Sequence, residues 1–173
     1  GPAACITALT LSGLSTRRFC FEGFLPTDKK ERQVVLERLK KETRTTVFYE
    51  APHRLLKTLP LLIEAAGEDR KGSVCREITK RHETVFRATL GEAYAYYQAN
   101  EPKGEIVLVL EGVSQKKLDE EQQQSWESMS IEDHMALYMS QGLQKKEAMK
   151  RVAADRGVTK RDIYQYLVDC KDE

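Results

Sequence analysis

The sequence lacks any long hydrophobic run: no apolar stretch approaches the roughly 20 residues that a membrane-spanning helix needs. It also has little excess charge, because 28 Lys and Arg face 27 Asp and Glu and leave a formal net charge of +1. Any attraction to nucleic acid therefore has to come from local patches. The four cysteines, Cys5, Cys20, Cys75 and Cys170, stand far apart without a Cys-x-x-Cys pair. This spacing predicts reduced cytosolic thiols and neither a disulfide framework nor a metal site.

Common phosphate-binding signatures are also missing, since there is no Gly-x-Gly-x-x-Gly fingerprint and no P-loop. What the sequence does have is alternating strand and helix patterns. Residues 1–112 predict five strands and four helices with one hairpin, which indicates an α/β domain with a mixed five-stranded sheet and flanking helices. The composition of residues 113–130 indicates a polar linker or a frayed helix. Residues 131–173 predict a small all-α module of the helix-turn-helix type.

One strand pattern, over residues 18–24, alternates clearly. Phe19 and Phe21 are expected on one face of the strand, and Glu22 and Phe24 on the other. A carboxylate in such an aromatic strand needs a partner or a ligand. The other elements of this domain are expected as helices over residues 3–13, 29–41, 52–67 and 91–98, strands over 45–49, 72–79 and 84–90, and a fully buried central strand over 106–110.

Four polar or ionisable side chains gather where the strand at residues 45–49 is followed by a helix: Tyr49, Glu50, His53 and Arg54. In α/β folds, ligands bind at the end of the sheet where strands lead into helices. The pattern therefore predicts a ligand site, although a joint with solvated charges fits the same residues. A second polar cluster, Arg76, Glu77 and Lys80, follows the strand at 72–79, and mutual ion pairing would explain it equally well.

The helical module contains two helices joined by a short turn at Gly157. The last helix is expected to bury Ile163, Tyr164 and Leu167. Basic residues flank the turn, which favours contact with nucleic acid over a plain three-helix bundle. The cations concerned are Lys145, Lys146, Lys160 and Arg161.

Five blocks of residues follow one another along the chain: Gly1-Pro-Ala-Ala4, Phe21-Glu-Gly-Phe-Leu-Pro26, Phe48-Tyr-Glu-Ala-Pro-His-Arg54, Arg76-Glu-Ile-Thr-Lys80 and Lys103-Gly-Glu-Ile-Val-Leu-Val-Leu-Glu-Gly112. With these blocks the chain resembles the C-terminal half of the bacterial small-subunit ribosomal RNA (cytidine-2′-O)-methyltransferases, within the tetrapyrrole-methylase-like superfamily. The third and fourth blocks separate this branch from the corrin and siroheme methylases. The likeness extends to the helical module.

The resemblance implies S-adenosylmethionine as methyl donor, folded in a cleft between two α/β domains. It implies a homodimer in the cytoplasm that acts on small-subunit rRNA or the 30S subunit, without a membrane. It places a further domain with a glycine-rich cofactor loop before Gly1, so that this chain alone is expected to be inactive. Ala3 stands where the family usually has Ser. The residues implied at the cofactor are Ala3, Ala4, Tyr49, Glu50, Ser73, Cys75, Gly104 and Glu105.

On the RNA side the resemblance implies Glu22, Tyr49, His53, Arg54, Arg76, Glu77 and Lys80. Methyl transfer to a ribose 2′-OH needs alignment of the reacting atoms and removal of a weakly acidic proton. Glu50, Glu22 and Lys80 are the candidate bases, and the sequence does not choose among them. A non-catalytic RNA-binding or dimerisation module is the alternative function. A corrin-type methylase of small molecules is disfavoured by the basic helical module.

Overall fold

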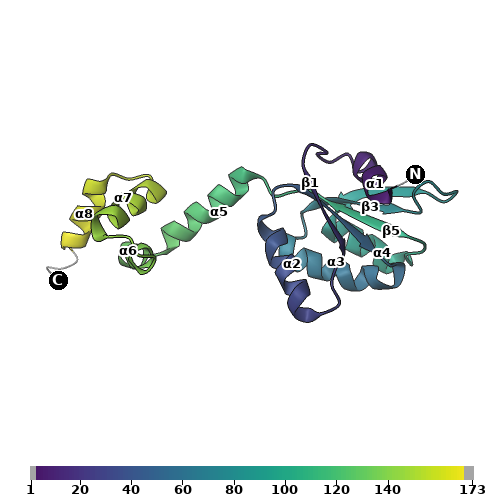
Figure 1. Ribbon diagram of the computed structural model, residues 1–173, viewed down its shortest axis with the longest axis horizontal. Helices are drawn as coiled ribbons and strands as arrows, with labels where there is room; N and C mark the ends of the chain where they lie inside the picture. Colours follow the sequence, from purple (N-terminus) through teal and green to yellow (C-terminus); the bar gives the residue numbers. More distant parts are fainter. Residues whose placement is uncertain (1–2, 170–173) are drawn as a thin grey trace. The chain divides into compact units, whose positions relative to one another are not determined.

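The computed structural model describes residues 3–169, so Cys170, one of the four expected thiols, lies outside the described residues. The chain forms two compact units that divide between Ser114 and Gln115, the first α/β and the second helical (Figure 1). Within the described part of the chain, every helix is too short or too polar to span a membrane.

Local capping explains where several helices of the α/β unit begin. The Asp28 carboxylate accepts hydrogen bonds from the backbone N–H groups of Lys30 (2.9 Å) and Glu31 (3.0 Å) at the start of α2. Thr89 and Glu92 form a capping box at the start of α4. The elements are α1 (Ala4–Ser12), β1 (Phe19–Phe24), α2 (Lys29–Lys41), β2 (Thr45–Glu50), α3 (Pro52–Ala66), β3 (Lys71–Arg76), β4 (Thr84–Thr89), α4 (Leu90–Ala99) and β5 (Ile106–Leu110).

The strands form one mixed sheet in the order β1-β2-β5-β3-β4. β1 and β2 are parallel, and all other neighbours are antiparallel. β5 is the last strand in the sequence, yet it lies in the centre with every residue buried, as its apolar pattern predicts. The register aligns Glu50, Ile106, Arg76 and Thr84 across one end of the sheet. This end, where β1, β2 and β3 finish and β4 and β5 begin, is called the site edge.

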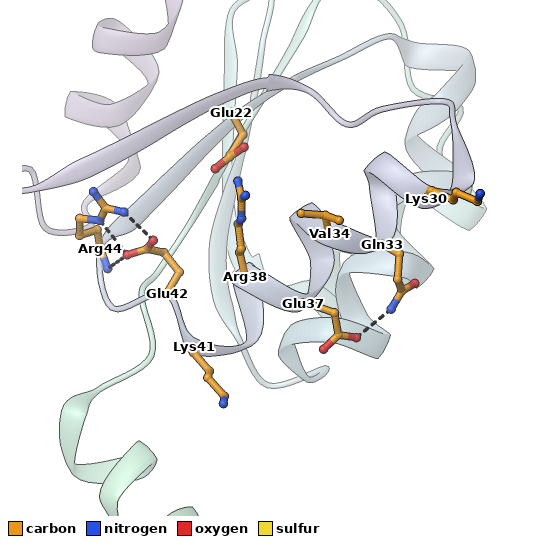
Figure 2. Close-up of a pocket in the computed structure, with 9 residues that line it drawn as sticks. All are labelled: Glu22, Lys30, Gln33, Val34, Glu37, Arg38, Lys41, Glu42 and Arg44. Carbon is orange, nitrogen blue, oxygen red and sulfur yellow. Dashed lines mark hydrogen bonds and ion pairs between the residues drawn. The ribbon is translucent and has the colours of Figure 1, made fainter. Parts of the chain in front are cut away.

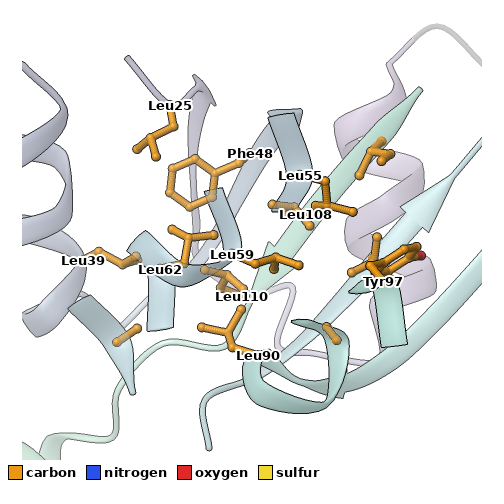
Figure 3. Close-up of a cluster of buried hydrophobic side chains, with 14 of the residues drawn as sticks. Leu25, Leu39, Phe48, Leu55, Leu59, Leu62, Leu90, Tyr97, Leu108 and Leu110 are labelled. Atoms are coloured by element: carbon orange, nitrogen blue, oxygen red, sulfur yellow. The ribbon is translucent and has the colours of Figure 1, made fainter. Parts of the chain in front are cut away.

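Helices cover both faces of the sheet. α1 packs on one face over a cluster that includes Val47 and Val109. The larger core lies on the other face, beneath α2, α3 and α4, where Phe48, Leu59 and Leu108 are buried together (Figure 3). A strand side chain that points to one face of the sheet therefore packs near α1, and one that points to the other face packs near α2, α3 or α4.

The edge strand β1 departs from the expected alternation. A β-bulge between Phe21 and Gly23 shifts its register on β2, and Gly23 adopts φ = +67°. Phe24 therefore packs on the Tyr49 ring (5.8 Å between centroids), as Phe21 does (4.9 Å). The prediction that Phe24 shares a face with Glu22 is wrong, because the bulge adds one residue to the strand.

The second unit consists of α5 (Gln115–Ser128), α6 (Ile131–Ser140), α7 (Lys145–Arg156) and α8 (Lys160–Asp169). The segment expected as a polar linker is mostly the regular helix α5. Side chains four residues apart support this polar helix, as where Gln115 donates a hydrogen bond to Asp119 (2.9 Å). α7, a turn at Gly157 and α8 form the expected helix pair, with Met149, Val152 and Ile163 in its core.

A buried histidine lies between two aromatic rings in the helical unit. The imidazole of His134 is fully buried, and it stacks on Trp126 (4.2 Å between centroids) and Tyr138 (5.3 Å). Its Nδ1 accepts a hydrogen bond from Arg156 Nε (3.2 Å), so the neutral ring carries its proton on Nε2, which lies 3.3 Å from an Asp155 carboxylate oxygen. Burial, and after it the charge of Arg156, lowers the pKa of His134.

We expect the helical unit to lose stability as the pH falls below about 6.5, the ordinary pKa of histidine. As the pH falls, the unfolded chain binds the proton before the folded chain does. The contribution of His134 to the free energy of unfolding is therefore complete above that pH, and it declines as the pH falls toward the lowered pKa of the folded state. Urea unfolding at pH 7.0, 6.0 and 5.0, followed by the fluorescence of Trp126, the one tryptophan of the chain, measures this decline. The His134→Gln variant should show a flatter dependence. An unfolding midpoint that is constant from pH 7 to 5 in the wild type would contradict the expectation.

Candidate functional site

Helix α1 starts at the site edge and runs away from it along the sheet. Cys5, in its first turn, lies beside the Tyr49 side chain near the end of β2. The Leu11 carbonyl, one and a half turns later, accepts hydrogen bonds from Arg87 of β4 at 2.6 and 3.0 Å. Ala4, the exposed first residue of α1, therefore lies at the same edge as the ends of β2 and β3.

The carboxylate of Glu50 is buried under α3 and fully engaged. Glu50 is 3% exposed. One of its oxygens accepts from the Ala51 N–H (2.8 Å) and lies 3.5 Å from Arg54 Nε, while the other accepts from Thr58 Oγ1 (2.5 Å). Arg54 in turn donates to the Leu25 carbonyl (2.8 Å). This geometry favours a structural role in the β2–α3 joint, because the carboxylate is buried and each of its oxygens already accepts a hydrogen bond within the fold.

Tyr49, the residue before Glu50, points to the opposite face. It forms part of the α1-side cluster. Phe21 and Phe24 pack edge-on against it and remain 49% and 56% exposed, so three aromatic rings form a partly open surface beside α1. Burial, and after it the contact with Cys5, raises the pKa of the Tyr49 phenol. Ala4, Tyr49 and Gly104 thus share the site edge, whereas the Glu50 side chain lies across the sheet from them.

Ser73 and Cys75, which the resemblance implies at the cofactor, lie within β3 with their side chains turned away from solvent. Both are buried beneath α1, where their side chains lie 3.4 Å apart and Cys75 contacts the Ala8 carbonyl. β3 is paired with β5 on one side and β4 on the other, so the sheet occupies its backbone groups.

The turn after β3 has an unusual backbone. β3 ends at Arg76, earlier than predicted, because Glu77 and Thr79 adopt φ of +51° and +64°, which non-glycine residues rarely do. Ile78, between them, is buried against the α1-side cluster and holds the turn down. Arg76 donates to Thr84 Oγ1 (3.1 Å). Such conformations concentrate at ligand-binding sites, where the surrounding contacts maintain them.

A network of charges joins this turn to the turn before β5. The Glu77 carboxylate accepts from the Glu105 backbone N–H (2.8 Å) and from Lys80 Nζ (3.2 Å), and Lys80 also bonds the Glu105 carboxylate (3.0 Å). Gly104 adopts φ = +77°, and a Cβ at this position would overlap the Glu77 carboxyl group. The two carboxylates raise the pKa of Lys80, Glu105 contributing most, which stabilises the ammonium form and disfavours Lys80 as a base.

Glu22, the third candidate base, lies on the α2 side of the sheet. It lines a hollow of about 890 Å³ between β1 and α2 (Figure 2). Lys30, Arg38 and Glu42 line the same hollow, so its charges are mixed. Hydrogen bonds from Arg44 lower the pKa of Glu42 to about 2. The structure therefore separates Glu22 from Tyr49 and Ala4, which lie on the other face of the sheet.

The residues expected on the RNA side fall into two groups. His53 is exposed on the first turn of α3, and Arg76 is half-buried, with a hydrogen bond to Thr84. In the helical unit, all four predicted cations line one groove between α7 and α8, together with Met149 and Tyr164. The prediction that Tyr164 points inward is wrong: it is 58% exposed, because Ile163 and Leu167 take the inward face of α8. The sequence thus indicated the cations but missed the ring between them. The four cations are Lys145, Lys146, Lys160 and Arg161.

Curated relatives match nearly the whole chain. It is 43% identical over 164 residues to ribosomal RNA small subunit methyltransferase I of Bacillus subtilis (strain 168), which is 95% of the chain and 56% of that protein. The proteins of the same name from Synechocystis and Escherichia coli O157:H7 are 42% and 37% identical over 98% of the chain, and 59% and 57% of their own lengths are covered. The chain thus spans less than two thirds of the relatives it matches.

Solved structures share the fold. A cobalt precorrin-4 methyltransferase, CbiF, superposes with a TM-score of 0.50 and 16% identity over 63% of this chain and 48% of its own. The methyltransferase CobJ gives a TM-score of 0.52 and 15% identity over 64% of this chain and 48% of its own. The family model for tetrapyrrole (corrin/porphyrin) methylases matches residues 1–94, more than half of the chain. The fold, the sequence relatives and the family model all indicate the same family, and the chain belongs to the tetrapyrrole methylase family.

Proposed function

We propose that the chain is the C-terminal part of an S-adenosylmethionine-dependent methyltransferase that modifies the ribose 2′-OH of a cytidine in small-subunit rRNA. The observation that carries this proposal is the 37–43% identity, over 95–98% of the chain, to proteins named ribosomal RNA small subunit methyltransferase I. The cytidine and its 2′-OH are what the resemblance of the five sequence blocks implies, and the turns of these blocks that the structure describes lie at the site edge.

The residues at the head of α1 fit the methyl donor. Ala3, the N-cap, makes no side-chain cap hydrogen bond, so first-turn N–H groups of α1 are available to an acceptor such as the donor's carboxylate. Ala3 and Ala4 are small enough to let a ligand approach, and Tyr49 and the Gly104–Glu105 turn lie at the same edge. When bound, S-adenosylmethionine supplies an electrophilic sulfonium methyl group.

In this proposal the residues of the chain position the reactants, and they do not remove the proton of the 2′-OH. The Glu77–Lys80–Glu105 network holds two turns of the site edge in fixed register, and alignment of reactants is worth roughly 7–11 kcal/mol in favourable cases. Arg76 and the exposed His53 offer donors to phosphate oxygens. The Phe21, Phe24 and Tyr49 rings offer a surface on which an unpaired base can stack.

The remaining length of the relatives would supply the other wall of the donor cleft. We therefore expect this chain alone to be inactive in methyl transfer, and we propose that the whole protein works as a homodimer in the cytoplasm. A non-catalytic RNA-binding or dimerisation module is the alternative.

Calorimetric titration and a transfer assay test the proposal. We expect the full-length protein to bind S-adenosylmethionine and to transfer its methyl group to 30S subunits, detected as a 2′-O-methylcytidine in digested rRNA. Ala4→Leu should weaken donor binding at least tenfold by filling the head of α1, while Thr10→Leu, exposed on the same helix but far from its first turn, should not. RNA binding without any donor binding would favour the alternative, and unchanged methylation in cells that lack the gene would refute the proposal.

A further inference from the structure

The groove between α7 and α8 differs in its charges from the hollow between β1 and α2. It is an open surface groove of about 610 Å³. Its lining consists of four cations, one aromatic ring and one methionine, and it contains no carboxylate. The β1–α2 hollow, by comparison, mixes acids with bases. A groove of one sign attracts an anion, whereas mixed charges satisfy one another.

The four cations of this groove are not held in ion pairs within the described part of the chain; they are Lys145, Lys146, Lys160 and Arg161. Two acids adjoin these cations in sequence, Glu147 after Lys146 and Asp162 after Arg161. Asp162 accepts hydrogen bonds from the N–H and Oγ1 of Thr159 (2.8 and 2.6 Å) and so serves as a helix cap. Four like charges held around one hollow repel one another, and an anionic ligand would relieve that repulsion.

Tyr164 stands among these cations with 58% of its surface exposed, while Met149 beneath it is buried. An exposed aromatic ring that the fold does not need is a stacking surface for a planar ligand. Cations that track phosphates, combined with a ring that stacks on a base, are the pattern by which proteins bind single-stranded nucleic acid. A purely anionic ligand would have no use for the ring, and a duplex would keep its bases stacked away from it.

We propose that this groove binds a nucleotide of single-stranded RNA, with its base on Tyr164 and its phosphates against Lys145, Lys146, Lys160 and Arg161. In the setting of the proposed function, the helical unit would hold an unpaired segment of the rRNA substrate. The inference rests on that function for the identity of the RNA, but the binding itself requires no methyl transfer.

Fluorescence anisotropy with a labelled 12-nucleotide single-stranded RNA tests the groove in the full chain, without methyl donor. We expect Tyr164→Ala to weaken binding about 5- to 100-fold with little change in salt dependence, since stacking is lost and no charge is removed. Tyr164→Phe should restore most of the affinity. Lys146→Ala should weaken binding and lower the slope of log Kd against log salt by about 0.7, the value for one phosphate contact with a single strand.

Matched controls use residues of the same helices that do not line the groove. Arg151→Ala removes a cation from α7 and Tyr166→Ala removes a ring from α8, and both should bind as the wild type does. Circular dichroism and Trp126 fluorescence check that each variant is folded. Equal binding by Tyr164→Ala and wild type, or a preference for duplex over single strand, would overturn the proposal. If the full-length protein showed no methyl transfer but the variants changed RNA binding as expected, the proposed function would be refuted and the proposed RNA-binding groove would be supported.

Discussion

Replacing Gly112 with alanine is expected to destabilise the α/β unit by about 3 kcal/mol, the upper part of the range for overpacked sites. The reason is a close approach of two backbone segments rather than backbone strain. A Cβ on Gly112 would overlap the Thr43 carbonyl group and lie 2.8 Å from the Arg44 nitrogen. The segments cannot simply separate, because the N–H next along the chain, of Val113, donates to the Glu42 carbonyl (2.8 Å).

Thermal unfolding followed by far-ultraviolet circular dichroism should show the Gly112→Ala effect as a fall in Tm of roughly 10 °C. Gly91→Ala is the matched control. Gly91 lies in the first turn of α4, its Cβ would meet only Glu68 at 3.3 Å, and alanine favours the helix, so little net change is expected. Trp126 fluorescence reports the helical unit and should be unaffected in both variants. An unchanged Tm for Gly112→Ala would mean that the α2–β2 turn moves freely.

Glu50→Ala is expected to cost the α/β unit about 2–3 kcal/mol. The change leaves the buried Thr58 hydroxyl and the Ala51 N–H without an acceptor, and it leaves the Arg54 guanidinium without its counter-charge. Losing one partner of a fully buried ion pair costs more, but Arg54 is 27% exposed and water screens it. Urea unfolding measures the loss, and Glu64→Ala, an exposed acid on α3, should stay within about 0.5 kcal/mol of the wild type.

The Glu50→Gln variant separates a structural role from a catalytic one. Glutamine keeps an acceptor for Thr58, so a structural residue predicts a small loss of stability and near-normal methyl transfer by the full-length protein at 25 °C. A general base predicts a fall of about 10²- to 10⁴-fold in the same assay. Such a fall in activity, in a variant that is still folded, would indicate that Glu50 acts as the general base.

Much of the fold follows from local patterns. Periodicity and turn residues predicted the elements of the α/β unit, and the unbroken run 106–110 predicted the central strand. These predictions succeeded because the buried faces of a strand or helix determine the spacing of its apolar residues along the sequence. The segment 115–128 misled the same reasoning, since its polar composition resembles a linker while its i, i+4 side-chain pairs and the stacking of Trp126 on His134 support a helix.

The candidate site was harder to predict, because it depends on which way side chains point. The motif around Glu50 suggested a residue beside the cofactor, yet the strand pleat sends this side chain toward Thr58 and its neighbour Tyr49 toward α1. The β1 bulge moves Phe24 to the Tyr49 face, and the isolated Gly23 in this strand was the signal that could have predicted it. The helical register predicted Tyr164 inward, and this was wrong because Tyr164 lies next to Ile163, which takes the inward position of α8.

The central place of β5 also bears on how the nascent chain matures. Until residues 106–110 leave the ribosome, the β1–β2 pair and the β3–β4 hairpin are two half-sheets, each with an open inner edge. The last strand then closes both edges at once. The sheet of the α/β unit can therefore be completed only after residues 106–110 are synthesised, and chaperones that shield unpaired strands would matter most before that point.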